Sequence, residues 1–449
     1  MSFFKNYLIA AALILSAGCA ATTYQSVRPG PGTTTYHNNK WAEPVEVNYD
    51  EPEDFSDEQP DLPVYKLRKT GPANPTTAVQ VLLFDCKNFD EVDGRIQELK
   101  AAGFNTIIFR VFHNKKDRPY YFAEYGNDRG VYFKTDQAPV VDDILGKIAE
   151  ITRRNGMELF AWMTTRYADY GVENRDGWQA MKYDLKTGEF VKAKGLNLFR
   201  NDVRDHLKKL YADLSRYDID GILFQDDLVL RHTEGFSKEA RLAFKKKYNH
   251  MPDPAMLYKD VRVRSDGSYK VARYGSWFWE WSRWKNRSLL DVVKGIMEET
   301  RSIKPQMKFA VNFMYEAALK PKDALAWLSQ NIAEAVKLDF DLYAIMAYHR
   351  QMGKELNVKG PELVKLVGDL AENALQMVND PGKALIKLQI MDWKSREVLP
   401  VSEVGAILRV IREKGGKSIA FVPYKNEFNF TRLSGLISNE RAGYLVSRR

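Results

Sequence analysis

The chain has 449 residues, a length that suits one large domain with extensions rather than a small module. Hydrophobic residues make up 45% of it, enough for a sizeable core, and the formal net charge is +8. Only two cysteines are present, which excludes a cysteine-based metal site.

The first residues have the pattern of an export signal. Lys5 precedes an apolar run, residues 7–15, that is too short to span a bilayer. The sequence "LSAGC" then ends at Cys19 and is similar to a bacterial lipobox, although its Leu lies one position early. We expect lipidation of Cys19, with an ordinary cleaved signal peptide as the alternative. Ala20 after the cysteine favours the outer membrane, so residues 1–19 predict a periplasm-facing lipoprotein of the cell envelope.

Residues 20–75 have the composition of a disordered tether. Thr, Pro and Gly dominate its first part, and residues 43–61 carry nine acids and no Lys or Arg. Such a segment buries too little apolar surface to order itself. Residues 1–42 carry three basic residues and no acid, which leaves residues 62–449 with 14 positive charges in excess. For an exported protein, this charge indicates an anionic membrane face rather than nucleic acid.

Eight short apolar runs follow the tether, and longer amphipathic segments separate them. Each run is near-continuously hydrophobic, as expected for a parallel sheet covered on both faces. Helical patterns such as residues 88–103 and 141–156 end at Gly103 and Gly156. Together they predict an α/β fold, a (β/α)8 TIM barrel over residues 76–449. The apolar runs are residues 79–85, 105–112, 157–163, 220–227, 307–315, 340–348, 384–393 and 417–424.

Two long insertions, residues 113–140 after strand two and 228–276 after strand four, are expected to wall the active-site face. Residues 275–305 form a helical pattern in which Trp277, Trp281 and Trp284 share one face. We expect this helix to dock on the barrel, with a tryptophan platform for sugar or membrane as the alternative. Cys86 is expected to be a small buried side chain.

Polar and aromatic side chains gather where the predicted strands end. In a TIM barrel these ends meet at one face, which carries the active site. Carboxylates and amides bind hydroxyl groups and aromatic rings stack on sugars, so the set predicts a polysaccharide site. The residues are Asp85, Arg110, Trp162, Asp226, Asp227, Asn312, Tyr315, Tyr348, Asp392 and Trp393.

Asp226 and Asp227 are the candidate catalytic residues, because a buried strand ends on them. Glycoside hydrolysis usually needs two carboxyl groups, and neighbours on an extended strand point to opposite sides. One interpretation makes Asp226 catalytic and Asp227 a loop cap, and another makes both of them caps. No cofactor is expected. The six histidines show no metal-ligand spacing, and no phosphate-binding glycine loop or nucleophile elbow is present.

The strand motifs "LFAWM", "DGILFQDD", "AVNFMY", "DFDLYAIMAY" and "KLQIMDW" occur in this order. As a set they resemble the C-terminal hydrolase domain of bacterial poly-β-1,6-N-acetylglucosamine deacetylases, glycoside hydrolase family 153, over about residues 76–430. The resemblance implies a (β/α)8 fold and hydrolysis of partially de-N-acetylated poly-glucosamine in biofilm matrix. It also implies that Trp162, Asn312, Tyr315, Asp392 and Trp393 are substrate-groove residues.

The chain departs from that family after strand four. Members typically show Phe-His-Asp-Asp there, and in this chain Phe224, Asp226 and Asp227 match but Gln225 replaces the histidine. Because the tether stands where the fused deacetylase domain would be, metal-dependent deacetylation is not expected.

A second departure follows at once. Arg231 and His232 stand where acids are common in the family, which leaves Glu234 as the candidate second acid. The predicted function is therefore a lipid-anchored hydrolase acting on a poly-β-1,6-glucosamine-like polymer, although the basic body keeps a neutral or anionic polysaccharide open. The alternative is a non-catalytic polysaccharide-binding lipoprotein that assists export, with export-machinery partners.

Overall fold

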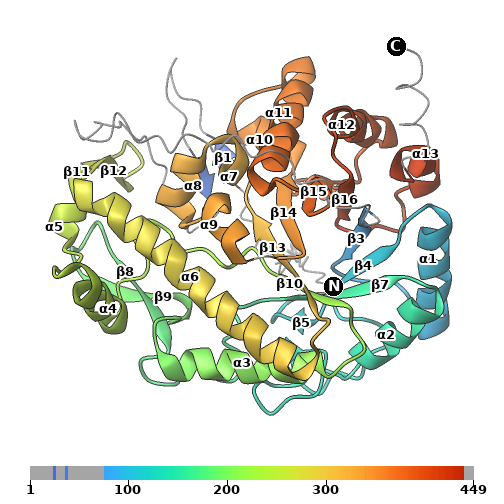
Figure 1. Ribbon diagram of the computed structural model, residues 1–449, viewed down its shortest axis with the longest axis horizontal. Helices are drawn as coiled ribbons and strands as arrows, with labels where there is room; N and C mark the ends of the chain where they lie inside the picture. Colours follow the sequence, from blue (N-terminus) through green and yellow to red (C-terminus); the bar gives the residue numbers. More distant parts are fainter. Residues whose placement is uncertain (1–23, 27–35, 39–74, 339, 439–449) are drawn as a thin grey trace, which may run out of the picture.

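The computed structural model describes residues 24–26, 36–38, 75–338 and 340–438 (Figure 1). Its centre is a closed barrel of eight parallel strands, each followed by one or more helices before the next. The predicted (β/α)8 barrel is confirmed. The barrel strands are β3 (Thr77–Val81), β4 (Thr106–Arg110), β7 (Glu158–Met163), β10 (Gly221–Phe224), β13 (Lys308–Phe313), β14 (Leu342–Ala347), β15 (Ala384–Gln389) and β16 (Ser418–Val422).

Neighbouring barrel strands are also neighbours in the chain, and the ring closes where β16 pairs with β3. Each of the eight apolar runs overlaps one barrel strand, but the first run is shifted, because its strand begins at Thr77, two residues before the run. β3 ends at Val81, and Phe84 beyond it is fully buried in the core without belonging to a strand. The apolar pattern overestimates this strand because a buried loop segment is as hydrophobic as a strand.

The helices surround the barrel, and their ends follow local sequence signals. In α1 the side chain of Asn88 accepts a hydrogen bond from the Glu91 amide at 2.9 Å. Gly103 and Gly156, just beyond α1 and α2, have φ of +99° and +64°. These left-handed conformations confirm both glycines as helix stops. The helices are α1 (Phe89–Ala101), α2 (Leu145–Arg154), α3 (Asn201–Ser215), α4 (Lys238–Tyr248), α5 (Pro254–Leu257), α6 (Ser276–Ile303), α7 (Glu316–Leu319), α8 (Pro321–Leu328), α9 (Ile332–Ala335), α10 (His349–Glu355), α11 (Gly360–Val378), α12 (Val401–Glu413) and α13 (Ser434–Ile437), with 3-10 turns η1 (Val336–Leu338) and η2 (Phe430–Leu433).

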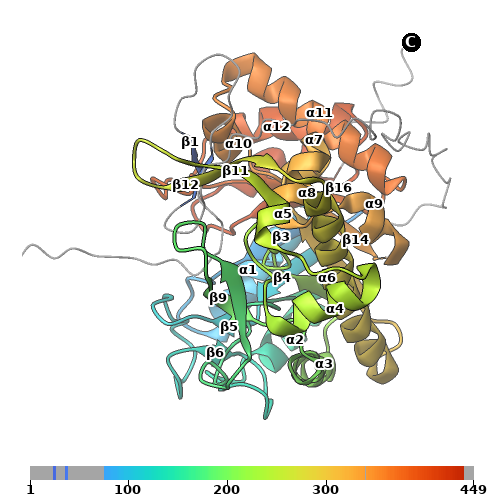
Figure 2. The same ribbon diagram turned by 90° about the vertical axis from the view of Figure 1, so that its left-hand side faces the viewer.

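Hairpins occupy the loops that follow strands two, three and four of the barrel. The two insertions expected from the sequence contain β5 (Phe112–His113) with β6 (Gly130–Val131), and β11 (Tyr258–Val263) with β12 (Tyr269–Tyr274). The β11–β12 hairpin projects from the body of the protein (Figure 2). A third hairpin, β8 (Gln179–Tyr183) with β9 (Phe190–Leu196), follows β7 and was not predicted.

The long helix α6 crosses the molecule diagonally and packs along α3 (Figure 1). Trp281 is fully buried, and its ring stacks on that of Trp284 with centroids 4.9 Å apart. Trp277, partly buried, contacts His250 edge to face. The predicted docking of this helix on the body is therefore what the structure shows, and the tryptophans contribute core rather than an open platform.

Cys19 and most of residues 20–75 lie outside the described residues. Within the described part of that segment, β1 (Tyr24–Ser26) pairs antiparallel with β2 (Tyr36–Asn38). Cys86 is buried, and burial raises the pKa of its thiol to about 11, as suits a packing residue. No helix in the described ranges is both long and apolar enough to cross a bilayer.

Candidate active site

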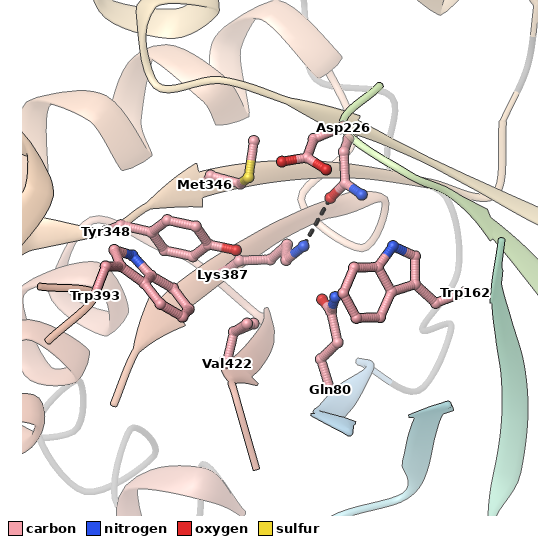
Figure 3. A pocket seen from close by; sticks show the side chains of 9 residues that line it. Gln80, Trp162, Asp226, Met346, Tyr348, Lys387, Trp393 and Val422 are labelled. Atoms are coloured by element: carbon pink, nitrogen blue, oxygen red, sulfur yellow. Dashed lines mark hydrogen bonds between the residues drawn. The ribbon is translucent and has the colours of Figure 1, made fainter. Parts of the chain in front are cut away.

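A small pocket opens at the carboxyl ends of the barrel strands (Figure 3). Most of the eight strands, or the residues just after them, contribute side chains to its wall, so the closure of the barrel brings together residues far apart in the chain. Its position is the usual one for active sites in this fold. The lining residues are Gln80, Trp162, Asp226, Asn312, Met346, Tyr348, Lys387, Trp393 and Val422.

The wall of this pocket carries polar atoms without protein partners. The Oε1 of Gln80 and the Nε1 atoms of Trp162 and Trp393 are buried, and none of them has a hydrogen-bond partner. Buried polar groups are normally satisfied, so exceptions that face open space indicate a polar ligand or water. One acceptor and two donors beside the rings of Trp162, Trp393 and Tyr348 match what a sugar presents: hydroxyl or amide groups and an apolar ring face.

Asp226 is the only carboxylate among the described residues that line the pocket. Burial raises the pKa of its side chain to about 7, and Asp227 adds to this effect while the Lys387 ammonium opposes it. Lys387 itself is held by Asn312, whose Oδ1 accepts a hydrogen bond from Nζ at 2.8 Å (Figure 3). The pocket therefore contains a carboxyl group that can both give and take a proton near neutral pH.

Asp227 points elsewhere and holds the loop after β7. Its carboxylate accepts hydrogen bonds from the Thr164 hydroxyl at 2.7 Å and from the amides of Thr165 and Tyr167 at 2.9 and 2.7 Å. Burial raises its pKa, and these three donors work against that rise. The two adjacent carboxyl groups thus diverge, and the geometry matches the interpretation in which Asp227 is a loop cap.

Glu234, the candidate second acid, does not line this pocket. It accepts a hydrogen bond from the Arg231 amide at 2.9 Å and forms an ion pair with the fully buried Arg166 at 3.1 Å. Burial on its own raises the pKa of Glu234, but the positive charges of Arg166 and Arg231 outweigh it and hold the pKa below its usual value. A paired carboxylate with a lowered pKa is suited to holding the loop after β10.

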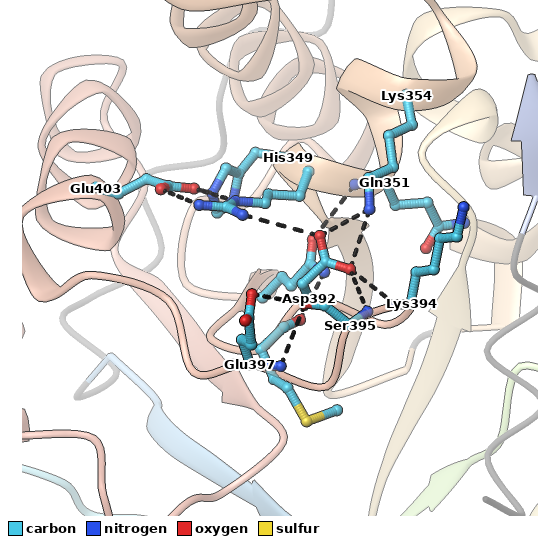
Figure 4. Close-up of polar contacts among 11 residues, drawn as sticks. His349, Gln351, Lys354, Asp392, Lys394, Ser395, Glu397 and Glu403 are labelled. Atoms are coloured by element: carbon cyan, nitrogen blue, oxygen red, sulfur yellow. Dashed lines mark hydrogen bonds and ion pairs between the residues drawn. The ribbon is translucent and has the colours of Figure 1, made fainter.

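Asp392 is also a loop anchor rather than a pocket residue (Figure 4). It accepts hydrogen bonds from the Lys354 ammonium at 2.7 Å and from the Lys394 amide at 2.8 Å. Burial opposes these contacts, but they keep the pKa of Asp392 below its usual value. Beside it, Glu403 pairs with Arg350 at 2.7 Å, and this network joins the loop after β15 to α10 and α12.

The other three predicted binding residues also lie outside the pocket wall. Arg110 forms an ion pair with Asp117 at 3.2 Å, and the Tyr315 hydroxyl donates to Glu355 at 2.7 Å. Asp85, four residues beyond β3, is half exposed and pairs with Arg118. Trp162, Asn312, Tyr348 and Trp393 are thus the predicted binding residues that the fold brings together with Asp226.

Four lining residues were missed by reading strand ends: Gln80, Met346, Lys387 and Val422. They lie within strands rather than after them. Two of them left a signal in the sequence, because Gln80 and Lys387 are polar residues with apolar neighbours on both sides inside buried runs. An unpaired polar group in a buried strand is costly, so such a residue indicates a partner or a cavity inside the barrel. Met346 and Val422 left no signal that distinguishes them from core residues.

No group of three or more potential metal-ligating side chains occurs within the described ranges. The side chains that line the pocket offer a carboxyl group from Asp226, an ammonium group from Lys387, two amides and several aromatic rings.

Residues 86–422 match the model of a family described as hypothetical glycosyl hydrolase family 13, GHL13. The match covers well over half of the chain. The chain belongs to this family. Membership in GHL13 identifies the barrel as that of a glycoside hydrolase, which confirms the predicted enzyme class. No curated protein matches the chain.

Solved structures similar to this GHL13 member are also glycosidase barrels. The glycoside hydrolase domain of PgaB (BpsB) from Bordetella bronchiseptica aligns with a TM-score of 0.63 at 20% identity, over 81% of this chain and 99% of that one. The catalytic domain of β-amylase from Paenibacillus polymyxa aligns with a TM-score of 0.52 at 12% identity, over 82% and 99%. A β-galactosidase from Marinomonas ef1 has a TM-score of 0.53 at 11% identity, over 83% and 60%. At these identities the likeness concerns the fold, and the PgaB domain agrees with the resemblance in the strand motifs.

Proposed function

We propose that this protein hydrolyses a polysaccharide in the barrel pocket, with Asp226 as the general acid and base. The observation that carries the proposal is the position of Asp226, a carboxyl group with a pKa of about 7 beside unpartnered sugar-binding atoms and aromatic rings. A group with this pKa is partly protonated at neutral pH, so it can protonate a leaving glycosidic oxygen.

Asp226 is the one carboxylate in the described part of the pocket wall, which favours a mechanism that needs a single protein carboxyl group. Most glycosidases use two carboxyl groups, but some use an N-acetyl group of the substrate as the nucleophile. In that mechanism the acetamido oxygen attacks the anomeric carbon, the bond to the leaving oxygen breaks, and Asp226 transfers its proton to that oxygen. Water then opens the cyclic intermediate and returns a proton to Asp226. The free Oε1 of Gln80 offers an acceptor for the acetamido N–H.

An N-acetylhexosamine polymer is therefore the proposed substrate, and partially de-N-acetylated poly-β-1,6-glucosamine is the polymer favoured by the strand motifs. The similar PgaB barrel is itself a glycoside hydrolase domain, which supports the reaction class.

The proposed location is the periplasmic face of the outer membrane, through lipid on Cys19. The support is the apolar run followed by "LSAGC" near the start of the chain. A Cys19→Ser variant is expected to move from the membrane fraction to the soluble fraction. If the variant still sediments with membranes like the wild type, the anchor is not at Cys19.

The test of the activity is release of reducing ends from partially de-N-acetylated poly-β-1,6-glucosamine by the purified full chain. Asp226→Asn is expected to abolish most of this release while the protein stays folded. Glu234→Gln is the matched control, because Glu234 is a buried acid outside the pocket. Loss of activity in Glu234→Gln without loss of stability would instead place the second catalytic acid in the loop after β10.

One observation favours a second function, a non-catalytic polysaccharide-binding protein that assists export. The only carboxylate in the described pocket wall lies beside Lys387. In the loop that follows, Arg231 and His232 stand where acids are common in the family that the strand motifs resemble. In that case the wild type releases no reducing ends but is retarded in gels that contain the polymer, and Asp226→Asn changes the retardation alone.

A further inference from the structure

A second polar and aromatic cluster lies outside the pocket, formed by Asp85, Arg118 and Tyr121. The Arg118 guanidinium pairs with the Asp85 carboxylate and donates a hydrogen bond to the Tyr121 hydroxyl at 3.1 Å. The same guanidinium lies 5.2 Å from the centre of the Tyr121 ring. Arg118 and Asp85 are 44% and 47% exposed, and Tyr121 is 64% exposed. Tyr121 is the most exposed large hydrophobic side chain within the described ranges.

The structure holds Tyr121 outward. Its neighbours on both sides pack inward: Tyr120 is buried, and Phe122 packs against Phe89 with ring centroids 4.7 Å apart. The rings of Tyr120 and Phe122 also contact each other, at 5.0 Å. Because both neighbours are fixed, the exposed ring is presented at a defined place, and a ligand that stacks on it loses little by ordering the loop.

The cluster belongs to the same face of the barrel as the pocket. Asp85 follows the pocket residue Gln80 by five residues, so their Cα atoms are at most about 18 Å apart. The Tyr120 hydroxyl donates to the carbonyl of Leu82 at 3.4 Å. The side chain of Leu82 packs against the apolar cluster that includes the pocket residues Tyr348 and Trp393. The insertion that carries Tyr121 is thus tied to the pocket wall through one residue.

We propose that Tyr121, Arg118 and Asp85 form a secondary subsite for sugar units of the polymer that extend beyond the pocket. The Tyr121 ring takes the apolar face of a sugar, and the carboxylate and guanidinium accept from and donate to its hydroxyl groups. The subsite rests on the proposed polysaccharide function and extends it to long chains.

The experiment compares long, partially de-N-acetylated poly-β-1,6-glucosamine with short oligosaccharides of the same sugars, using the full chain. Tyr121→Ala is expected to lower the ratio of kcat/KM for polymer over kcat/KM for oligosaccharide about tenfold, which is the effect of losing one stacking contact. Tyr121→Phe keeps the ring and is expected to keep most of that ratio. Leu242→Ala, which removes a 49% exposed side chain from α4, is the control and should match the wild type.

Retardation in gels containing the polymer supplies a second readout that does not need cleavage. Tyr121→Ala is expected to migrate faster than the wild type and Tyr121→Phe to migrate with it. If the wild type cleaves or binds the polymer and Tyr121→Ala does so equally well, the subsite is overturned and the proposed function stands. If the wild type neither cleaves nor binds the polymer at any chain length, the proposed function is wrong, and the subsite that rests on it is wrong too. If Tyr121→Ala loses the same fraction of kcat/KM on polymer and on oligosaccharide, the subsite is also overturned.

Discussion

Asp226 and Asp227 are adjacent in the chain but have opposite surroundings. Asp226 faces a pocket with unpartnered polar atoms, and its pKa is raised to about 7. Asp227 is saturated by one hydroxyl and two amide donors of the loop after β7. A single step along an extended backbone thus separates a group available for proton transfer from a group that maintains the architecture.

The same contrast separates Asp226 from three other acids that follow barrel strands. Asp227, Glu234 and Asp392 are satisfied carboxylates, each paired with a cation or with loop amides. These contacts fix the loops after β7, β10 and β15. An acid at a strand end is therefore a candidate for catalysis only when its partners leave it facing open space, and burial alone does not distinguish the two kinds.

The largest effect on activity is expected from replacing Asp226. Asp226→Asn is expected to reduce kcat by roughly 10²–10⁴-fold, because the amide cannot transfer a proton. In the wild type the rate should fall as pH rises above about 7, since the acid form of Asp226 is the one that protonates the leaving group. Initial rates of reducing-end release between pH 5 and pH 9 measure both effects. Wild-type rates in Asp226→Asn would place the catalytic acid elsewhere.

Stability against pH tests the same residue without a substrate. The pKa of Asp226 is raised by folding, so the folded state binds a proton that the unfolded state has lost, and stability falls as pH rises from about 4 to about 7. Asp226→Asn removes this loss and should gain on the order of 3 kcal/mol over the wild type at pH 8, with little gain at pH 4. Urea unfolding at pH 4 and pH 8 measures this gain in the free energy of unfolding. A gain of equal size at both would mean that the charge is not the cause.

Replacing Asp227 is expected to lower the free energy of unfolding rather than raise it. Asp227→Ala leaves the Thr164 hydroxyl and two loop amides without their acceptor, which should cost about 2 kcal/mol of the free energy of unfolding. Urea unfolding at pH 7 measures this loss, with Asp226→Ala as the matched control on the pocket side. If Asp227→Ala is as stable as Asp226→Ala but has lost its activity, the division between the two residues is wrong.

The smallest effect is expected at the ion pair between Lys354 and Asp392. Lys354→Met removes the ammonium group that contacts Asp392 at 2.7 Å, but Lys354 is about half exposed and solvent screens the pair. The expected cost is about 0.5 kcal/mol, with kcat unchanged. Thermal unfolding measures the loss of stability, and initial rates of reducing-end release measure kcat. A large fall in kcat would show that Asp392 takes part in the reaction.

The sequence predicted the barrel well, because near-continuous apolar runs and amphipathic helices with glycine stops are direct consequences of burial and local conformation. It also predicted a group of side chains at one face, and Trp162, Asn312, Tyr348 and Trp393 line one pocket there with Asp226. Asp85, Arg110, Tyr315 and Asp392 were predicted by the same rule and lie outside it. A strand end determines the face on which a residue lies, but not the direction in which its side chain points.

That direction was decided by tertiary contacts alone. Asp227 turns to the loop after β7, Glu234 to Arg166, and Asp392 to Lys354, and each partner comes from a distant part of the chain. Lys387 reaches Asn312 from another strand of the ring. The sequence by itself therefore determined the fold and the set of candidate acids, since both depend on local patterns. Only the closed barrel determined which acid faces open space, because its pKa and its partners depend on residues that meet after the ring has closed.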